Sequence, residues 1–199
     1  WHRQRKRHRR APGATIDIDF GKMEPAPPPG QQCFHAVLIE GTGGNDDLEG
    51  SALEDHMLGL AGDDLLQGLA SNDLIEGGDG ADVLEGGEGN DVISGGRHYD
   101  RLYGEEGDDV LMGGDGDDYI SGGDGVDTVS YELARGAVSV DLSDTQGTQT
   151  VGAGMDYFIG VENLVGSSYG DALGGDDGVN RIEGRDGEDI IDGDEGDDV

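Results

Sequence analysis

A nine-residue phrase repeats along this chain and constrains its fold more than any other feature. Ten copies, numbered here 1 to 10, run without a gap from Gly41 to Ser130. Each copy has Gly at position 1, Asp at position 6, and an aliphatic residue or Met at position 8. Four further copies, numbered 11 to 14, begin at residues 166, 175, 184 and 193. Such a period predicts a repeat architecture in which each unit contacts only its neighbours.

The acidic and apolar positions of the repeat stay in strict register. In the first ten copies, position 6 is occupied by Asp46, Asp55, Asp64, Asp73, Asp82, Asp91, Asp100, Asp109, Asp118 and Asp127. Position 8 is occupied by Leu48, Met57, Leu66, Ile75, Leu84, Ile93, Leu102, Leu111, Ile120 and Val129. In the later copies, position 6 holds Asp171, Asn180, Asp189 and Asp198.

The glycine pattern predicts the local structure of each repeat. Recurring Gly marks backbone positions with positive φ or close approach, so positions 1 to 6 are expected to turn. Positions 7 to 9 suit a three-residue strand whose middle side chain points inward. The density of Gly excludes a helix. The sequence therefore predicts an all-β solenoid of stacked turn-and-strand units.

The charge of the chain predicts a bound cation. The 45 Asp and Glu residues far outnumber the 12 Lys and Arg, giving a formal net charge of −33. One aliphatic side chain in nine gives only a thin core, and stacked columns of Asp repel one another. Carboxylates and turn carbonyls are hard oxygen donors, which suit Ca²⁺ better than Zn²⁺ or Mg²⁺. Several Ca²⁺ ions are therefore expected between the turns.

The repeat resembles the signature G-G-x-G-x-D-x-U-x of the repeats-in-toxin (RTX, haemolysin-type) calcium-binding family, where U is a large aliphatic residue. The resemblance covers residues 41–130 and 166–199. It implies a parallel β-roll with two nonapeptides per coil, in which repeat n shares a Ca²⁺ with repeat n+2. Members of the family are typically exported from Gram-negative bacteria by type I secretion. The resemblance thus implies a secreted, extracellular protein whose parent chain uses the type I secretion machinery.

The same resemblance implies a set of metal ligands. Carried over to this sequence, they are Asp46, Asp64, Asp82, Asp91, Asp100, Asp109, Asp118, Asp127, Asp171 and Asp189. The pairs with Gly at positions 1 and 4 in both repeats are Asp46 with Asp64, Asp64 with Asp82, Asp91 with Asp109, and Asp109 with Asp127. The pair of Asp55 and Asp73 lacks both position-4 glycines and is expected to be weak or empty. The pair of Asn180 and Asp198 lacks one charge.

Four segments are expected along the chain. Residues 1–40 are basic and then Pro-rich, which favours a disordered tail or linker, and no signal peptide or transmembrane run is seen. Residues 41–130 form a first calcium roll, and residues 166–199 form a second one, truncated at its C-terminus. Between them, 131–165 is a non-repeat β insertion. It contains an alternating strand at 137–142 and a decayed repeat with Gly160, Glu162 and Leu164 at positions 4, 6 and 8.

Two other features of the sequence have simpler explanations than a functional site. The phrase "GSSYG" matches a nucleophile elbow at Ser168, but it falls in repeat register and no His follows it, so the visible chain is expected not to be an enzyme. The basic N-terminus could bind nucleic acid or anionic lipid. With an acidic body behind it, no nucleic-acid partner is expected, while contact with a membrane or cell surface stays open.

The sequence is compatible with three functions. The leading one is a calcium-binding β-roll of a secreted bacterial protein that folds on Ca²⁺ binding after export. The second is the C-terminal secretion and folding part of an RTX enzyme or toxin, such as a metalloprotease, lipase, epimerase or haemolysin, whose catalytic domain lies elsewhere. The third is a repeat adhesin.

Overall fold

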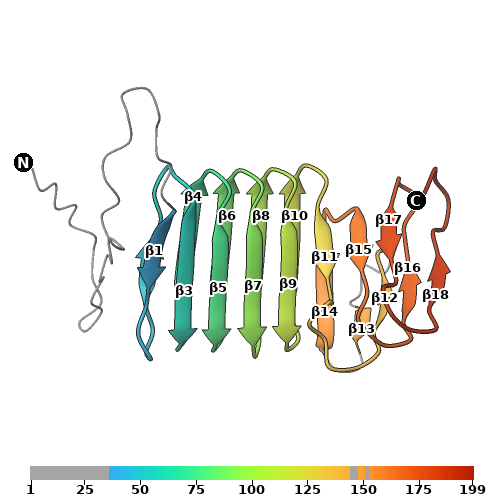
Figure 1. The fold of residues 1–199 in the computed structure, drawn as a ribbon, viewed down its shortest axis with the longest axis horizontal. Helices are drawn as coiled ribbons and strands as arrows, with labels where there is room; N and C mark the ends of the chain where they lie inside the picture. Colours follow the sequence, from blue (N-terminus) through green and yellow to red (C-terminus); the bar gives the residue numbers. More distant parts are fainter. Residues whose placement is uncertain (1–35, 144–147, 151–152) are drawn as a thin grey trace, which may run out of the picture.

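The computed structural model describes residues 36–143, 148–150 and 153–199, which form an all-β solenoid (Figure 1). The predicted fold class is confirmed. Of the basic, Pro-rich segment, residues 1–35 lie outside the described residues. None of the described residues belongs to a helix that could span a membrane.

The strands lie in three sheets. The first, sheet A, has the order β1 (Val37–Glu40), β3 (Asp55–Ala61), β5 (Leu74–Asp79), β7 (Val92–Arg97), β9 (Val110–Asp115), β11 (Thr128–Ser130), β15 (Asn163–Val165) and β17 (Arg181–Glu183). The second, sheet B, has the order β13 (Thr148–Thr150), β14 (Gly154–Ile159), β10 (Tyr119–Asp124), β8 (Arg101–Glu106), β6 (Val83–Glu88), β4 (Leu65–Ala70) and β2 (Asp47–Glu49). The third holds β12 (Ser139–Asp141), β16 (Ala172–Gly174) and β18 (Ile190–Asp192).

The register of the strands follows from the repeat. Met57 lies opposite Ile75, and Ile75 lies opposite Ile93, so each strand pairs in parallel with the strand 18 residues further along. Two nonapeptides therefore complete one coil, as the resemblance implied, and repeats 1 to 10 alternate between sheets B and A. Repeats 11 and 13 lie in the third sheet, as β16 and β18. Only the pairing of β13 with β14 is antiparallel among the strands of the described part.

The core is the double column of position-8 side chains. These side chains, from Met57 to Val129, are fully buried and belong to one cluster with Leu164 and Leu173. Their neighbours at positions 7 and 9 point outward, because side chains alternate across a strand. On the outside of sheet B, the rings of Tyr119 and Tyr157 stack with their centroids 5.8 Å apart.

The interior strands are longer than predicted. β6, for example, covers positions 7 to 9 of one repeat and positions 1 to 3 of the next. Positions 1 to 3 pair with the following coil, as Gly87 does with Glu105, because backbone groups that lie between stacked coils need hydrogen-bond partners. Only positions 4 to 6 are left to form each turn between the sheets.

The non-repeat segment rejoins the stack through β14. Ile159 lies opposite Ser121, so Gly160 occupies position 1 of a repeat. The sequence had predicted position 4 for Gly160. Glu162 follows only two residues later and occupies the place of a position-6 residue. The turn between β14 and β15 is thus shortened. The predicted alternating strand is present as β12, with Val138 and Val140 buried.

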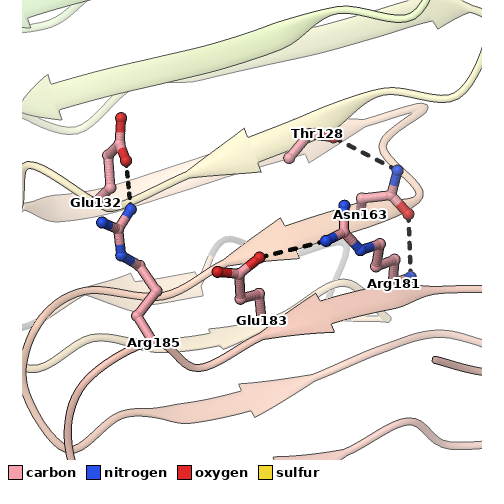
Figure 2. A network of polar contacts seen from close by, with 6 residues as sticks. All are labelled: Thr128, Glu132, Asn163, Arg181, Glu183 and Arg185. Atoms are coloured by element: carbon pink, nitrogen blue, oxygen red, sulfur yellow. Dashed lines mark hydrogen bonds and ion pairs between the residues drawn. The ribbon is translucent and has the colours of Figure 1, made fainter.

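Polar contacts join the coils after β11 (Figure 2). Asn163 donates from its amide to the hydroxyl of Thr128 over 3.4 Å, and its Oδ1 accepts from the backbone N–H of Arg181 over 3.0 Å. Arg185 pairs with Glu132, which lies just beyond β11. These contacts join the strand of repeat 10 to β15 at the end of the insertion, and join β15 to β17 after it.

Candidate metal centre

The position-6 carboxylates form a ladder along each edge of the roll. Odd-numbered repeats place theirs on the first edge, and even-numbered repeats place theirs on the second edge. On each edge, one carboxylate oxygen accepts from the N–H of the Asp one coil earlier. The Asp64 N–H donates to Asp82 Oδ1 over 2.8 Å, and the Asp82 N–H donates to Asp100 Oδ1 over 2.8 Å. On the second edge, the Asp91 N–H donates to Asp109 Oδ1 over 2.7 Å.

The second oxygen of these carboxylates has no partner. The residues whose Oδ2 is buried and unpaired are Asp64, Asp73, Asp82, Asp91, Asp100, Asp109, Asp118 and Asp127. Each of them exposes at most 3% of its surface. A buried polar atom without a partner costs free energy, and a buried charge costs more. The fold therefore leaves one strong acceptor unsatisfied in each of eight consecutive turns.

The position-1 glycines create the space around these oxygens. A Cβ added at Gly59 would lie 2.6 Å from Asp64 Oδ2 and 2.5 Å from the carbonyl oxygen of Gly77 in the next coil. A Cβ at Gly95 would likewise meet Asp100 Oδ2 at 2.5 Å. A carboxylate oxygen and a carbonyl oxygen thus converge over Gly59 and over Gly95. A side chain would fill this space, which explains why position 1 is always Gly.

Burial shifts the protonation of the ladder. Loss of solvent is the largest cause and raises the pKa of Asp100 to about 8 and of Asp118 to about 7. The hydrogen bond from the preceding Asp N–H lowers each pKa in part, and neighbouring carboxylates of the column raise it. The pKa is also raised, to about 7 in Asp73 and to about 6 in Asp64, Asp109 and Asp127. Ionised columns are therefore unfavourable in this fold until a cation accompanies them.

The donor set fits a hard cation. Among the described residues, no three His, Cys, Asp or Glu side chains converge on one point. Each coil places one position-6 carboxylate on each edge of the roll. Backbone carbonyls of the turns would therefore have to complete the coordination of an ion there. Oxygen-only ligation with many carbonyls is typical of Ca²⁺, whereas structural Zn²⁺ sites use Cys and His.

Comparison with known families decides what kind of roll this is. The family model of the RTX calcium-binding nonapeptide repeat matches residues 40–75, 49–84, 58–93, 67–100, 94–129 and 165–199. The chain belongs to the RTX calcium-binding repeat family. These matches span both repeat blocks and more than half of the chain. No curated protein matches the chain.

Three of the ten RTX positions predicted as ligands lie in different surroundings from the other seven. Asp46 Oδ2 accepts from the N–H of Thr42 over 2.6 Å and from its hydroxyl over 2.9 Å. Asp171 Oδ2 accepts from the N–H of Ser167 over 2.6 Å. Asp189 is half-buried, and its Oδ1 accepts from the Asp171 N–H over 2.9 Å. The other seven all carry the free, buried Oδ2.

The residues of the Asp55 and Asp73 pair differ from each other. The sequence predicted a weak or empty site for this pair, because both repeats lack Gly at position 4. Asp73 nevertheless has the same buried, unpaired Oδ2 as its neighbours. Asp55 instead accepts from the Ser51 N–H at Oδ2 over 2.6 Å, and its Oδ1 is the unpaired atom. The missing glycine does not prevent the turn, since Ser71 adopts φ +81° at position 4.

Two acidic residues continue the RTX ladders beyond repeat 10. The Asp118 N–H donates to Asp156 Oδ1 over 3.0 Å, and the Asp127 N–H donates to Glu162 Oε2 over 2.8 Å. Asp156 was missed as a site residue, although Gly154, Asp156 and Phe158 fit positions 4, 6 and 8. An aromatic residue at position 8 hid the match.

The candidate nucleophile lacks its required setting. Ser168 is exposed in the turn before β16, and no helix follows it. A nucleophile elbow needs a strand, a sharp turn and a helix. Its sequence match belongs to an RTX turn.

Proposed function

We propose that this RTX roll is a calcium-dependent folding module of a secreted bacterial protein, with several Ca²⁺ ions along its two edges. The observation that supports it is the row of eight buried carboxylate oxygens without a protein donor. The ligands proposed with this support are Asp64, Asp73, Asp82, Asp91, Asp100, Asp109, Asp118 and Asp127. For Asp46, Asp171 and Asp189, calcium binding stays a prediction from the sequence.

The same oxygens couple metal binding to folding. In the unfolded chain each carboxylate is hydrated, whereas in the roll it is buried and stacked on others of the same charge. A ligand that binds only the folded state stabilises it by mass action. Extracellular Ca²⁺ modules have dissociation constants of about 10⁻⁴ to 10⁻³ M. We therefore expect the roll to be unfolded at cytosolic Ca²⁺ concentrations and folded at millimolar Ca²⁺.

A Ca²⁺ titration followed by far-ultraviolet circular dichroism tests this function. We expect a disordered spectrum in excess EGTA, a cooperative gain of β signal near millimolar Ca²⁺, and no comparable gain with Mg²⁺ at equal ionic strength. A β signal that is already complete in EGTA would overturn the proposal.

We infer that the roll itself is not catalytic. The family it matches is defined by calcium-binding repeats and not by a catalytic site. If the parent protein is an RTX enzyme or toxin, its activity would belong to other segments. The purified roll is expected to show no hydrolytic activity. An activity that co-purifies with the roll and is lost in Ser168→Ala would contradict this inference.

A further inference from the structure

The turns of repeats 1 to 12 occur in two forms that differ at position 2. In repeats 3 to 10, position 2 has positive φ, and this holds even for Leu60 at +78°, Leu69 at +83° and Glu105 at +78°. We call these eight turns open turns. Position 2 of repeats 13 and 14, at Arg185 and Asp194, also has positive φ, but these two turns at the end of the roll lack a buried, unpaired position-6 oxygen and belong to neither group. In repeats 1, 2, 11 and 12, the position-2 residue lacks positive φ, and its N–H donates to the position-6 side chain of its own repeat. We call these closed turns, and their position-2 residues are Thr42, Ser51, Ser167 and Asp176.

A closed turn supplies its own hydrogen bonds. In repeat 1, Thr42 gives two donors, its N–H and its hydroxyl, to Asp46 Oδ2. In repeat 11, the Ser167 hydroxyl accepts from the Tyr169 N–H over 3.1 Å and donates to Asp171 Oδ1 over 2.7 Å. The acid and the turn backbone are thus paired without an ion, as in other turns closed by Ser, Thr or Asp.

An open turn has no such internal donor. Its position-2 residue is part of the strand and pairs with the next coil, as Leu60 does with Gly78 and Glu105 with Gly123. The position-6 Oδ2 is left without any partner in all eight open turns. The difference between the two forms therefore coincides with whether the position-6 oxygen that faces position 2 has a donor, although Asp55 in the closed turn of repeat 2 keeps an unpaired Oδ1.

We propose that the residue at position 2 decides which repeats take calcium, and that calcium is confined to the open turns. This inference rests on the proposed function, and it departs from the sequence-based prediction at Asp46 and Asp171. In a closed turn, an ion would have to displace the donors that already hold the carboxylate. A hydroxyl residue favours closure twice, because it adds a donor and, when β-branched, resists positive φ.

Glu105 and Glu106 allow a matched test in an open turn. Both are exposed, and replacement of either by Thr removes one negative charge. Glu105→Thr places a β-branched residue at φ +78° and offers Asp109 a hydroxyl, so this turn is expected to close. Glu106→Thr makes the same change at position 3. Bound calcium is counted by equilibrium dialysis with radioactive Ca²⁺ at saturation, with folding confirmed by circular dichroism.

We expect Glu105→Thr to bind at least one ion fewer than the wild type, and Glu106→Thr to bind the wild-type number. Equal numbers in the two variants would overturn the inference while leaving the proposed function intact. A wild-type chain that binds no Ca²⁺ would overturn both.

A variant that opens a closed turn tests the inference even if Glu105→Thr fails to fold. Repeat 1 already has Gly at positions 1 and 4, so Thr42→Gly removes the residue that closes its turn. We expect Thr42→Gly to bind at least one ion more than the wild type, and Thr42→Ser, which keeps the hydroxyl, to bind the same number as the wild type. A wild-type count in Thr42→Gly contradicts the inference.

Discussion

The glycine at position 1 and the carboxylate at position 6 of the same repeat form one unit. Their spacing of five residues brings Oδ2 over the glycine Cα, where only a hydrogen atom fits. The repeated Gly is therefore required for steric reasons, and the repeated Asp is required for its carboxylate. Each oxygen proposed to bind metal depends on the absence of a side chain five residues earlier.

Replacement of Gly95 by Ala tests this steric role. The added Cβ would lie 2.5 Å from Asp100 Oδ2 and 2.6 Å from the Gly113 carbonyl oxygen, so the turn has to shift. We expect Gly95→Ala to raise the Ca²⁺ midpoint of folding several-fold. The control is Gly43→Ala, since a Cβ at Gly43 meets nothing within 4 Å. Equal midpoints for the two variants would show that position 1 is not sterically required.

Tyr131 supplies a hydrogen-bond donor to a ladder carboxylate oxygen whose counterpart is unpaired in the open turns. Its buried hydroxyl donates to Asp156 Oδ2 over 2.7 Å, the oxygen that is unpaired in Asp118 one coil earlier. Tyr131→Phe leaves this oxygen without a donor and is expected to lower the free energy of unfolding by about 1–3 kcal/mol. Urea unfolding at saturating Ca²⁺ measures the loss. Tyr119→Phe, on the outer face, should change stability much less, and a similar loss in both variants counts against the role.

The two carboxylate ladders behave as continuous elements, because each residue shares a hydrogen bond with the next. Six ladder residues have folded pKa values of about 6 to 8, above the value of about 3.9 expected for unfolded Asp: Asp64, Asp73, Asp100, Asp109, Asp118 and Asp127. Burial raises the pKa of Asp82 and Asp91 in the same direction. The metal-free roll therefore binds protons more tightly than the unfolded chain does. Its stability is greatest below about pH 4 and is lost as the pH rises through the folded pKa values.

Acidification should thus replace part of the effect of calcium. In excess EGTA, lowering the pH from 8 to 5 is expected to increase the β signal in circular dichroism, because protons neutralise the ladders. At millimolar Ca²⁺, the signal should change little over the same range. If the circular dichroism spectrum of the metal-free chain does not change between pH 8 and pH 5, the raised pKa values are contradicted.

Strands and register could be predicted because the repeat has one dominant period. The spacing of Asp and aliphatic residues determined which side chains stack and which are buried. The length of the interior strands was underestimated, because glycine normally weakens a strand, whereas here Gly87 pairs with the next coil. The closed turns were missed for a different reason. Thr42 in place of Gly is a small change in the sequence, yet it alters the donors available to Asp46.

At the scale of the whole molecule, the acidic charge of the roll is expected to keep the chain unfolded where the Ca²⁺ concentration is low. A narrow export channel would also keep the chain unfolded. If the parent protein is exported through type I machinery, external calcium should speed export by folding each coil as it emerges. The prediction is a faster export of the full parent chain at millimolar external Ca²⁺ than in EGTA. In a variant with Asp64, Asp82, Asp91 and Asp109 all replaced by Ala, this difference should disappear. Export that is equally fast in every condition leaves only a static role for the repeats.

The uniform register of 18 residues per coil also has a mechanical consequence. Interior coils are attached to the coils on either side by nearly the same set of parallel-strand bonds. A force applied to the two ends would therefore detach coils singly from the ends, each releasing roughly 60 Å of chain when fully extended. The molecule would lengthen in equal steps, and on the proposed function bound Ca²⁺ would raise the force that each step needs.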